Sequence, residues 1–225
     1  MINSYDFVDI LSDKLPSDAI VVVDTGTSFT CAFQAAKMKH GQRWVSAPGH
    51  SSMGYAIPGA IGAAFASGRN VVAIIGDGAF QFNVQELSTI RHHNLPITIF
   101  VLNNGGYLTI AHMQANHFSR EVGCNPKSGL SFPSTMAIAG AYDIAHVCMT
   151  YRDRLILELD RLLDYGGPVV CEIMMPPNQP LIPRVSSLKR PDGSIASKPL
   201  EDMFPFLDRE EFKANMIVKA AEVLE

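Results

Sequence analysis

Residues 71–108 read VVAIIGDGAFQFNVQELSTIRHHNLPITIFVLNNGGYL, and this stretch decides the fold. It holds two short apolar runs rich in β-branched residues, Val71–Ile75 and Ile97–Leu102, which predict buried parallel strands. Between them apolar residues recur at helical spacing, and Asn83 is placed to act as the N-cap of that helix. The stretch therefore predicts a strand, a helix and a second strand.

Small polar residues follow each predicted strand. Gly76-Asp77-Gly78 ends the first and Asn103-Asn104-Gly105-Gly106 ends the second. Consecutive parallel strands usually pair, and ligands bind beyond their carboxyl ends, so we expect the two ends to lie together. A carboxylate and a carboxamide there suit Mg²⁺, and the free N–H groups of the helix after Gly78 suit a diphosphate. Asp-Gly and Asn-Gly pairs are also common turn signals, so each alone would indicate only a turn.

The spacing of these two motifs carries a resemblance. Gly76-Asp77-Gly78, twenty-four further residues and then Asn103-Asn104 resemble the diphosphate-binding signature of thiamine diphosphate enzymes, in the branch of acetolactate synthase and pyruvate decarboxylase. The resemblance implies two cofactors, thiamine diphosphate and Mg²⁺. By position, it implies that Asp77, Asn104 and the backbone carbonyl of Gly106 are the metal ligands.

Two further segments strengthen the resemblance. Thr25-Gly26-Thr27-Ser28 follows the apolar run Ala19–Val23 and resembles the first diphosphate-contacting loop of the family. Met53, with Gly54 and Pro58, matches the segment whose bulky apolar residue holds the cofactor bent, and Ser51 would accept a hydrogen bond from it through its backbone carbonyl. The expected cofactor-binding residues are Thr25, Gly26, Thr27, Ser28, Ser51, Met53, Gly76, Asp77, Gly78, Ala79, Asn104, Gly106, Tyr107 and Leu108.

Histidines are the candidates for proton transfer, because histidine titrates near neutral pH. His50, beside Ser51, and His112, in a predicted helix over the cofactor from Tyr107 to Phe118, are the expected catalytic residues. His112, Gln114 and His117 are also candidate substrate contacts. A solvated polar face explains these three equally well.

Composition limits the alternatives. The 225 residues are 47% hydrophobic and 18% charged, with a formal net charge of −4, so nothing favours nucleic acid or an anionic membrane as a partner. The four cysteines form no CxxC pair and are expected to be reduced core thiols. The first ten residues do not resemble a signal peptide, so we expect a cytoplasmic protein.

Alternating helix and strand patterns predict an α/β fold: a doubly wound, mostly parallel sheet of five or six strands with helices on both faces. We expect a thiamine diphosphate-binding domain over residues 1–175. Residues 176–225 are rich in proline and predict an extended arm with a last helix from about Asp208 to Leu224, packed on the same domain or on a partner subunit.

The resemblance covers one domain only, and no second α/β unit is visible to supply the pyrimidine-binding domain and its activating glutamate. We therefore expect the diphosphate- and Mg²⁺-binding subunit of a split enzyme, inactive alone and active as a heterotetramer with a separate pyrimidine-binding subunit. The implied reaction is decarboxylation of a 2-oxo acid followed by carboligation, which makes the protein a lyase or transferase.

Several alternatives stay open. The Met53 segment resembles acetolactate synthase more closely, whereas Asp24-Thr25-Gly26-Thr27-Ser28 is more decarboxylase-like, so a 2-oxo acid decarboxylase without carboligation is one alternative. A non-catalytic thiamine diphosphate-binding module is another. A nicotinamide-binding domain is disfavoured because no G-x-G-x-x-G follows the first strand.

Overall fold

The computed structural model describes residues 1–189 and 192–218. Backbone contacts divide the chain into two compact units, Met1–Gln179 and Pro180–Glu225. The division falls a few residues beyond the boundary predicted at residue 175.

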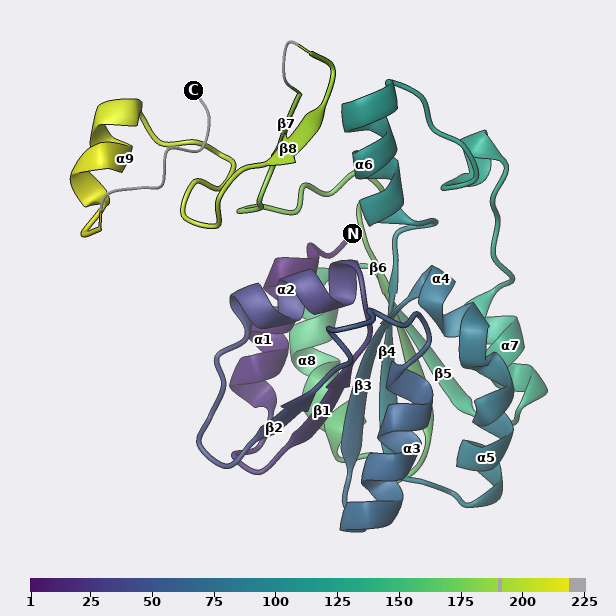
Figure 1. The fold of residues 1–225 in the computed structure, drawn as a ribbon. Helices are drawn as coiled ribbons and strands as arrows, with labels where there is room; N and C mark the ends of the chain where they lie inside the picture. The colour runs from purple at the N-terminus through teal and green to yellow at the C-terminus, as the bar shows by residue number, and fades with distance from the viewer. Residues whose placement is uncertain (190–191, 219–225) are drawn as a thin grey trace. The chain divides into compact units, whose positions relative to one another are not determined.

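The first unit is built on a six-stranded parallel sheet, which confirms the predicted fold class (Figure 1). The strand order is β2-β1-β3-β4-β6-β5, so the two strands of the 71–108 stretch are central neighbours. The strands are β1 (Ile20–Val23), β2 (Arg43–Val45), β3 (Val71–Gly76), β4 (Ile97–Asn103), β5 (Ala145–Met149) and β6 (Val169–Met174).

Helices cover both faces of this sheet, as a doubly wound fold requires (Figure 1). One face carries α1 (Ser4–Lys14), α2 (Thr27–Ala35) and α8 (Arg152–Leu163), and the other carries α3 (Ala56–Ser67), α5 (Leu87–His92) and α7 (Thr135–Ala141). The remaining helices of this unit are α4 (Asp77–Phe80), α6 (Leu108–Phe118) and the short 3₁₀ helices η1 (Gln81–Glu86) and η2 (Pro126–Ser128).

The core lies between the sheet and these helices. β3 and β4 are buried along almost their whole length, which is why their sequences are continuous apolar runs. On the α1 face, the fully buried rings of Phe7 and Phe100 lie 5.2 Å apart and join α1 to β4. On the other face, apolar residues of α3, α5 and α7 form one cluster with the strands.

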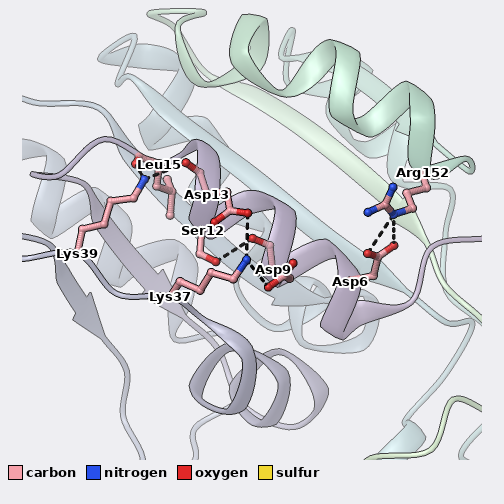
Figure 2. A network of polar contacts seen from close by, with 8 residues as sticks. All are labelled: Asp6, Asp9, Ser12, Asp13, Leu15, Lys37, Lys39 and Arg152. Carbon is pink, nitrogen blue, oxygen red and sulfur yellow. Dashed lines mark hydrogen bonds and ion pairs between the residues drawn. The ribbon is translucent and has the colours of Figure 1, made fainter.

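Polar contacts on the surface add to the attachment of α1 (Figure 2). Lys37, just after α2, lies 2.8 Å from Asp9 and 3.0 Å from Asp13 of α1. Arg152, at the start of α8, pairs with Asp6 at 2.9 Å. All of these groups are partly or largely exposed, so solvent screens the pairs and the buried rings dominate the attachment.

The segment after β3 differs from the prediction. Helix begins at Asp77, directly after the strand, and Asn83 is not an N-cap but an interior residue of η1 with non-helical backbone angles (φ −134°, ψ 31°). Its side chain donates instead to the carbonyl of Gly54, 3.0 Å away and 29 residues earlier in the chain. The cap prediction was wrong because a tertiary hydrogen bond takes the side chain away from the local backbone.

The second unit contains the antiparallel pair β7 (Ser187–Lys189) and β8 (Ile195–Ser197), and helix α9 (Arg209–Asn215). Asp208 caps α9 as predicted, accepting from the N–H groups of Glu210 and Glu211. The helix ends at Asn215, so the predicted extension is wrong for residues 216–218, and residues 219–224 lie outside the described part of the chain. How this arm packs stays a prediction.

Among the helices of the described residues, none combines the length and apolar character needed to cross a membrane.

Candidate cofactor site

The carboxyl ends of β3 and β4 bring the two sequence motifs together. Gly76 pairs with Leu102 in the parallel register, so Asp77 lies one residue and Asn104 two residues beyond this pair, at the same edge of the sheet. The Asp77 carboxylate reaches across to the second loop, where its Oδ2 accepts from the backbone N–H groups of Gly105 at 2.7 Å and Gly106 at 3.1 Å. The prediction that the two strand ends lie together is therefore confirmed.

Three oxygen-bearing groups converge at this edge. The Asn104 side-chain oxygen lies 3.3 Å from Asp77 Oδ1 and 2.7 Å from the Gly106 carbonyl oxygen. If the amide turns over, its nitrogen donates to both of these oxygens. With its oxygen inward, three acceptor oxygens face one another, an arrangement that a cation between them would stabilise. A carboxylate, an amide oxygen and a backbone carbonyl are ligands that Mg²⁺ accepts, so these residues fit the expected metal.

Asp77 is held where a charge is costly. Its side chain is 5% exposed, and burial raises its pKa to about 6 although three backbone N–H groups donate to it. A cation at the site would favour the ionised carboxylate, which accounts for an acidic residue at this buried position.

Glycines allow the loops to come this close. A Cβ on Gly106 would overlap the carbonyl oxygen of Cys124, and a Cβ on Gly78 would overlap the ring of Tyr107. Cys124 also accepts a 2.8 Å hydrogen bond from the N–H of Tyr107, so the chain beyond α6 returns to support the Gly106 turn.

The first predicted cofactor loop forms a second wall. Gly26 has φ 65° and precedes α2, and no side chain caps the N-terminus of that nine-residue helix. Uncapped N–H groups and the positive end of the helix dipole favour an anion there. Ser28 differs from the prediction: it is fully buried and its hydroxyl donates to the Thr25 carbonyl at 2.8 Å, so it stabilises the loop from behind.

A third wall comes from the loop before α3. Ser51 has a left-handed backbone, with φ 48°, which is uncommon for a residue other than glycine and costs free energy unless the surroundings enforce it. Two residues later Met53 lies partly buried against the core cluster of the α3 face. The strained turn therefore places both predicted cofactor contacts on one loop.

These walls enclose a cavity of about 230 Å³. Of the predicted cofactor-binding residues, all except Ser28 line it: Thr25, Gly26, Thr27, Ser51, Met53, Gly76, Asp77, Gly78, Ala79, Asn104, Gly106, Tyr107 and Leu108. The lining also includes residues that sequence reasoning missed, namely Leu102, Thr109, Ile110 and Met175. Met175 was missed because the strand order, in which β6 lies beside β4, is invisible in the sequence.

The predicted catalytic histidines do not line this cavity, although each is close in the chain to a residue that does. Neither His50 nor His112 is among the residues that line it, and His50 is exposed. Gln114 uses both ends of its amide on the backbone of Val122, at 2.7 and 3.1 Å, which occupies the side chain offered as a substrate contact. Catalytic roles for His50 and His112 stay predictions without support from this arrangement.

Comparison with known proteins agrees with this geometry. Residues 24–173 match the family described as thiamine pyrophosphate enzyme, C-terminal TPP binding domain. Acetolactate synthase 2, chloroplastic, of Zea mays is 31% identical over 186 residues, and acetolactate synthase 3, chloroplastic, of Brassica napus is also 31% identical over 186 residues.

These alignments cover 80% of this chain but only 29% and 28% of the two relatives, so the chain spans less than a third of their length. The matched region begins directly after β1 and contains β3, β4 and the three loops that line the cavity. The chain therefore belongs to the thiamine pyrophosphate enzymes, and it matches their C-terminal, cofactor-binding domain.

Proposed function

We propose that this chain binds the diphosphate of thiamine diphosphate through Mg²⁺, as one half of the active site of an acetolactate synthase-like enzyme. The observation that carries the proposal is the convergence of Asp77, Asn104 and the Gly106 carbonyl beside a helix N-terminus without a side-chain cap. Oxygen ligands would hold the metal, and the N-terminus of α2 would face the diphosphate.

The proposed reaction is decarboxylation of a 2-oxo acid followed by carboligation. When bound, the cofactor supplies the chemistry that removes CO₂, and the chain positions it. Both relatives are named acetolactate synthases, which favours carboligation over decarboxylation alone. The apolar lining from Met53, Leu108, Ile110 and Met175 suits the organic part of the cofactor.

The proposed partner is a pyrimidine-binding domain, either on a separate subunit of a heterotetramer or elsewhere in a longer chain. This chain matches only the C-terminal domain of the family, and the aligned region is 29% of the Zea mays relative. The remaining sequence of that relative leaves room for a further domain, which supports the proposed partner. That domain would supply the activating glutamate. We also propose a cytoplasmic location.

Calorimetric titration of thiamine diphosphate, with and without Mg²⁺, tests the proposal on this chain alone and after co-purification with its partner. We expect Mg²⁺-dependent binding that tightens with the partner present and is lost in Asp77→Ala. Asp153→Ala is the matched control, since it removes an exposed carboxylate of α8. Mg²⁺-independent binding, or full binding by Asp77→Ala, would refute the metal assignment.

The same preparation separates the alternative activities. CO₂ release with formation of a new carbon–carbon bond between two 2-oxo acids supports the acetolactate synthase-like reaction. CO₂ release without that bond indicates a decarboxylase. Tight cofactor binding without any turnover in the presence of the partner indicates a non-catalytic binding module.

A further inference from the structure

Gly54 is held on both sides of its backbone. Its N–H donates to Asp24 Oδ1 at 3.1 Å, and its carbonyl accepts from Asn83 Nδ2 at 3.0 Å. Its φ of 88° excludes most other residues, and a Cβ at this position would lie 2.8 Å from both Asn83 Nδ2 and Phe82 Cβ. The turn that carries Ser51 and Met53 is thus fixed at its end by two side chains from distant parts of the chain.

Asp24 joins two of the cavity walls. It follows β1, is 2% exposed, and accepts three backbone hydrogen bonds. One comes from Thr25 of the first cofactor loop, at 2.9 Å, and the others come from Gly54 and, at 2.8 Å, from Ala56 at the start of α3. A buried carboxylate with three donors stabilises their relative placement, because loss of any partner leaves part of a charge unsatisfied.

Asn83 joins the remaining wall. It lies six residues after Asp77, in the 3₁₀ helix that continues α4, and its non-helical backbone interrupts that helix. The bond to Gly54 therefore connects the segment that carries the metal-binding carboxylate to the Ser51–Gly54 turn. Neither Asn83 nor Asp24 lines the cavity.

We propose that Asp24 and Asn83 are positioning residues that hold the Ser51–Gly54 turn close to the segment that carries Asp77, and so set the width of the cavity. This inference rests on the proposed function, in which the side of the cavity at Asp77 binds the diphosphate and the side at Met53 contacts the organic part of the cofactor. Loss of either side chain weakens contact with the organic part and leaves the metal-diphosphate contact intact.

Asn83→Ala is the main test variant, since it removes the bond to Gly54 without burying a new charge. Asn83→Asp is the stricter one, because a carboxylate cannot donate to the Gly54 carbonyl and repels it. Gln85→Ala is the matched control: exposed Gln85 donates to Asn83 Oδ1 at 3.2 Å, so this variant removes the other hydrogen bond of Asn83 and leaves Gly54 untouched.

Two probes, each with Mg²⁺, separate the two ends of the cavity: thiamine diphosphate and inorganic diphosphate. In the preparation used for the cofactor titration, Asn83→Ala should weaken the binding of thiamine diphosphate by about fivefold to tenfold, which corresponds to the free energy of one hydrogen bond. It should leave the affinity for inorganic diphosphate within about twofold. Asn83→Asp should lose more affinity for thiamine diphosphate than Asn83→Ala does. Gln85→Ala should bind both probes with the affinity of the wild type.

Backbone amide exchange gives a readout that needs no cofactor. In Asn83→Ala the amides of Gly54 and Ala56 should exchange faster, while those of β3 and β4 keep their wild-type protection. Faster exchange throughout the sheet would indicate general destabilisation and overturn the inference.

The binding outcomes separate the two proposals. Equal weakening of both probes, or unchanged thiamine diphosphate affinity in Asn83→Ala and Asn83→Asp, overturns the positioning role while the proposed function stands. A wild-type protein that binds neither probe refutes the proposed function and the cofactor part of this inference together.

Discussion

Gly106→Ala should destabilise the first unit by an amount that the structure allows us to work out. The new methyl group would overlap the carbonyl oxygen of Cys124 and lie 3.2 Å from Asn125 Cα, so backbone must move rather than a flexible side chain. Overpacking of this kind costs about 1–3 kcal/mol. Movement of Cys124 also breaks its 2.8 Å hydrogen bond from Tyr107, which adds about 1 kcal/mol.

The expected loss is therefore about 2–4 kcal/mol in the free energy of unfolding, or about 4–16 °C in the melting temperature of a unit of this size. Urea unfolding followed by circular dichroism measures this loss. The dependence of the free energy of unfolding on urea concentration must stay the same in the variant, so that a shift of the midpoint reports stability alone. Gly62→Ala is the control: nothing lies within 4 Å of its added Cβ in α3, so alanine should stabilise by up to about 1 kcal/mol. A Gly106→Ala midpoint equal to that of the wild type would refute the steric reasoning.

Three further predictions follow from the burial and charge of single side chains. The pKa of Asp77 is raised from 3.8 to about 6, so between these pH values the folded protein keeps a proton that the unfolded chain has lost. Urea titrations of the metal-free protein should therefore show the free energy of unfolding falling by at most about 3 kcal/mol as pH rises from about 4 to 6. Asp77→Asn should remove this pH dependence. Phe7→Ala should cost about 3–5 kcal/mol, because the ring is fully buried against Phe100; a loss below about 1 kcal/mol would contradict the core assignment. Lys37→Ala should lower the urea midpoint far less, and the difference should vanish in about 1 M NaCl; a salt-independent difference would contradict screening.

The protonation of Asp77 also predicts how Mg²⁺ binding depends on pH. A proton and the metal compete for the same carboxylate, so the apparent Mg²⁺ affinity should fall as pH drops through about 6. Calorimetry at several pH values checks this, and an affinity that stays constant between pH 7 and 5 would show that Asp77 is not the ligand.

The sheet and the meeting of Asp77 with Asn104 at its edge were predictable because their signals are local. Val71–Ile75 and Ile97–Leu102 are apolar at every position, as central strands of a parallel sheet must be, and the polar residues after them can only lie at the carboxyl edge. The helix boundaries were less predictable. Nothing in the composition of residues 27–39 marks where a helix stops, so the end of α2 at Ala35 was not predictable.

Asn83 and Asp24 were missed as positioning residues because their partners are distant in the chain. Asn83 has the local signal of an N-cap, because it is a polar residue three positions before Glu86. Its side-chain amide instead donates to the carbonyl of Gly54. No sequence signal marks Asp24 as a link between loops, because three backbone N–H groups are available to any carboxylate that the fold brings to them. A motif identifies the groups that bind a ligand when their spacing is fixed by one strand-helix-strand unit. The groups that hold three separate loops in register are determined by the assembled sheet, and only the structure shows them.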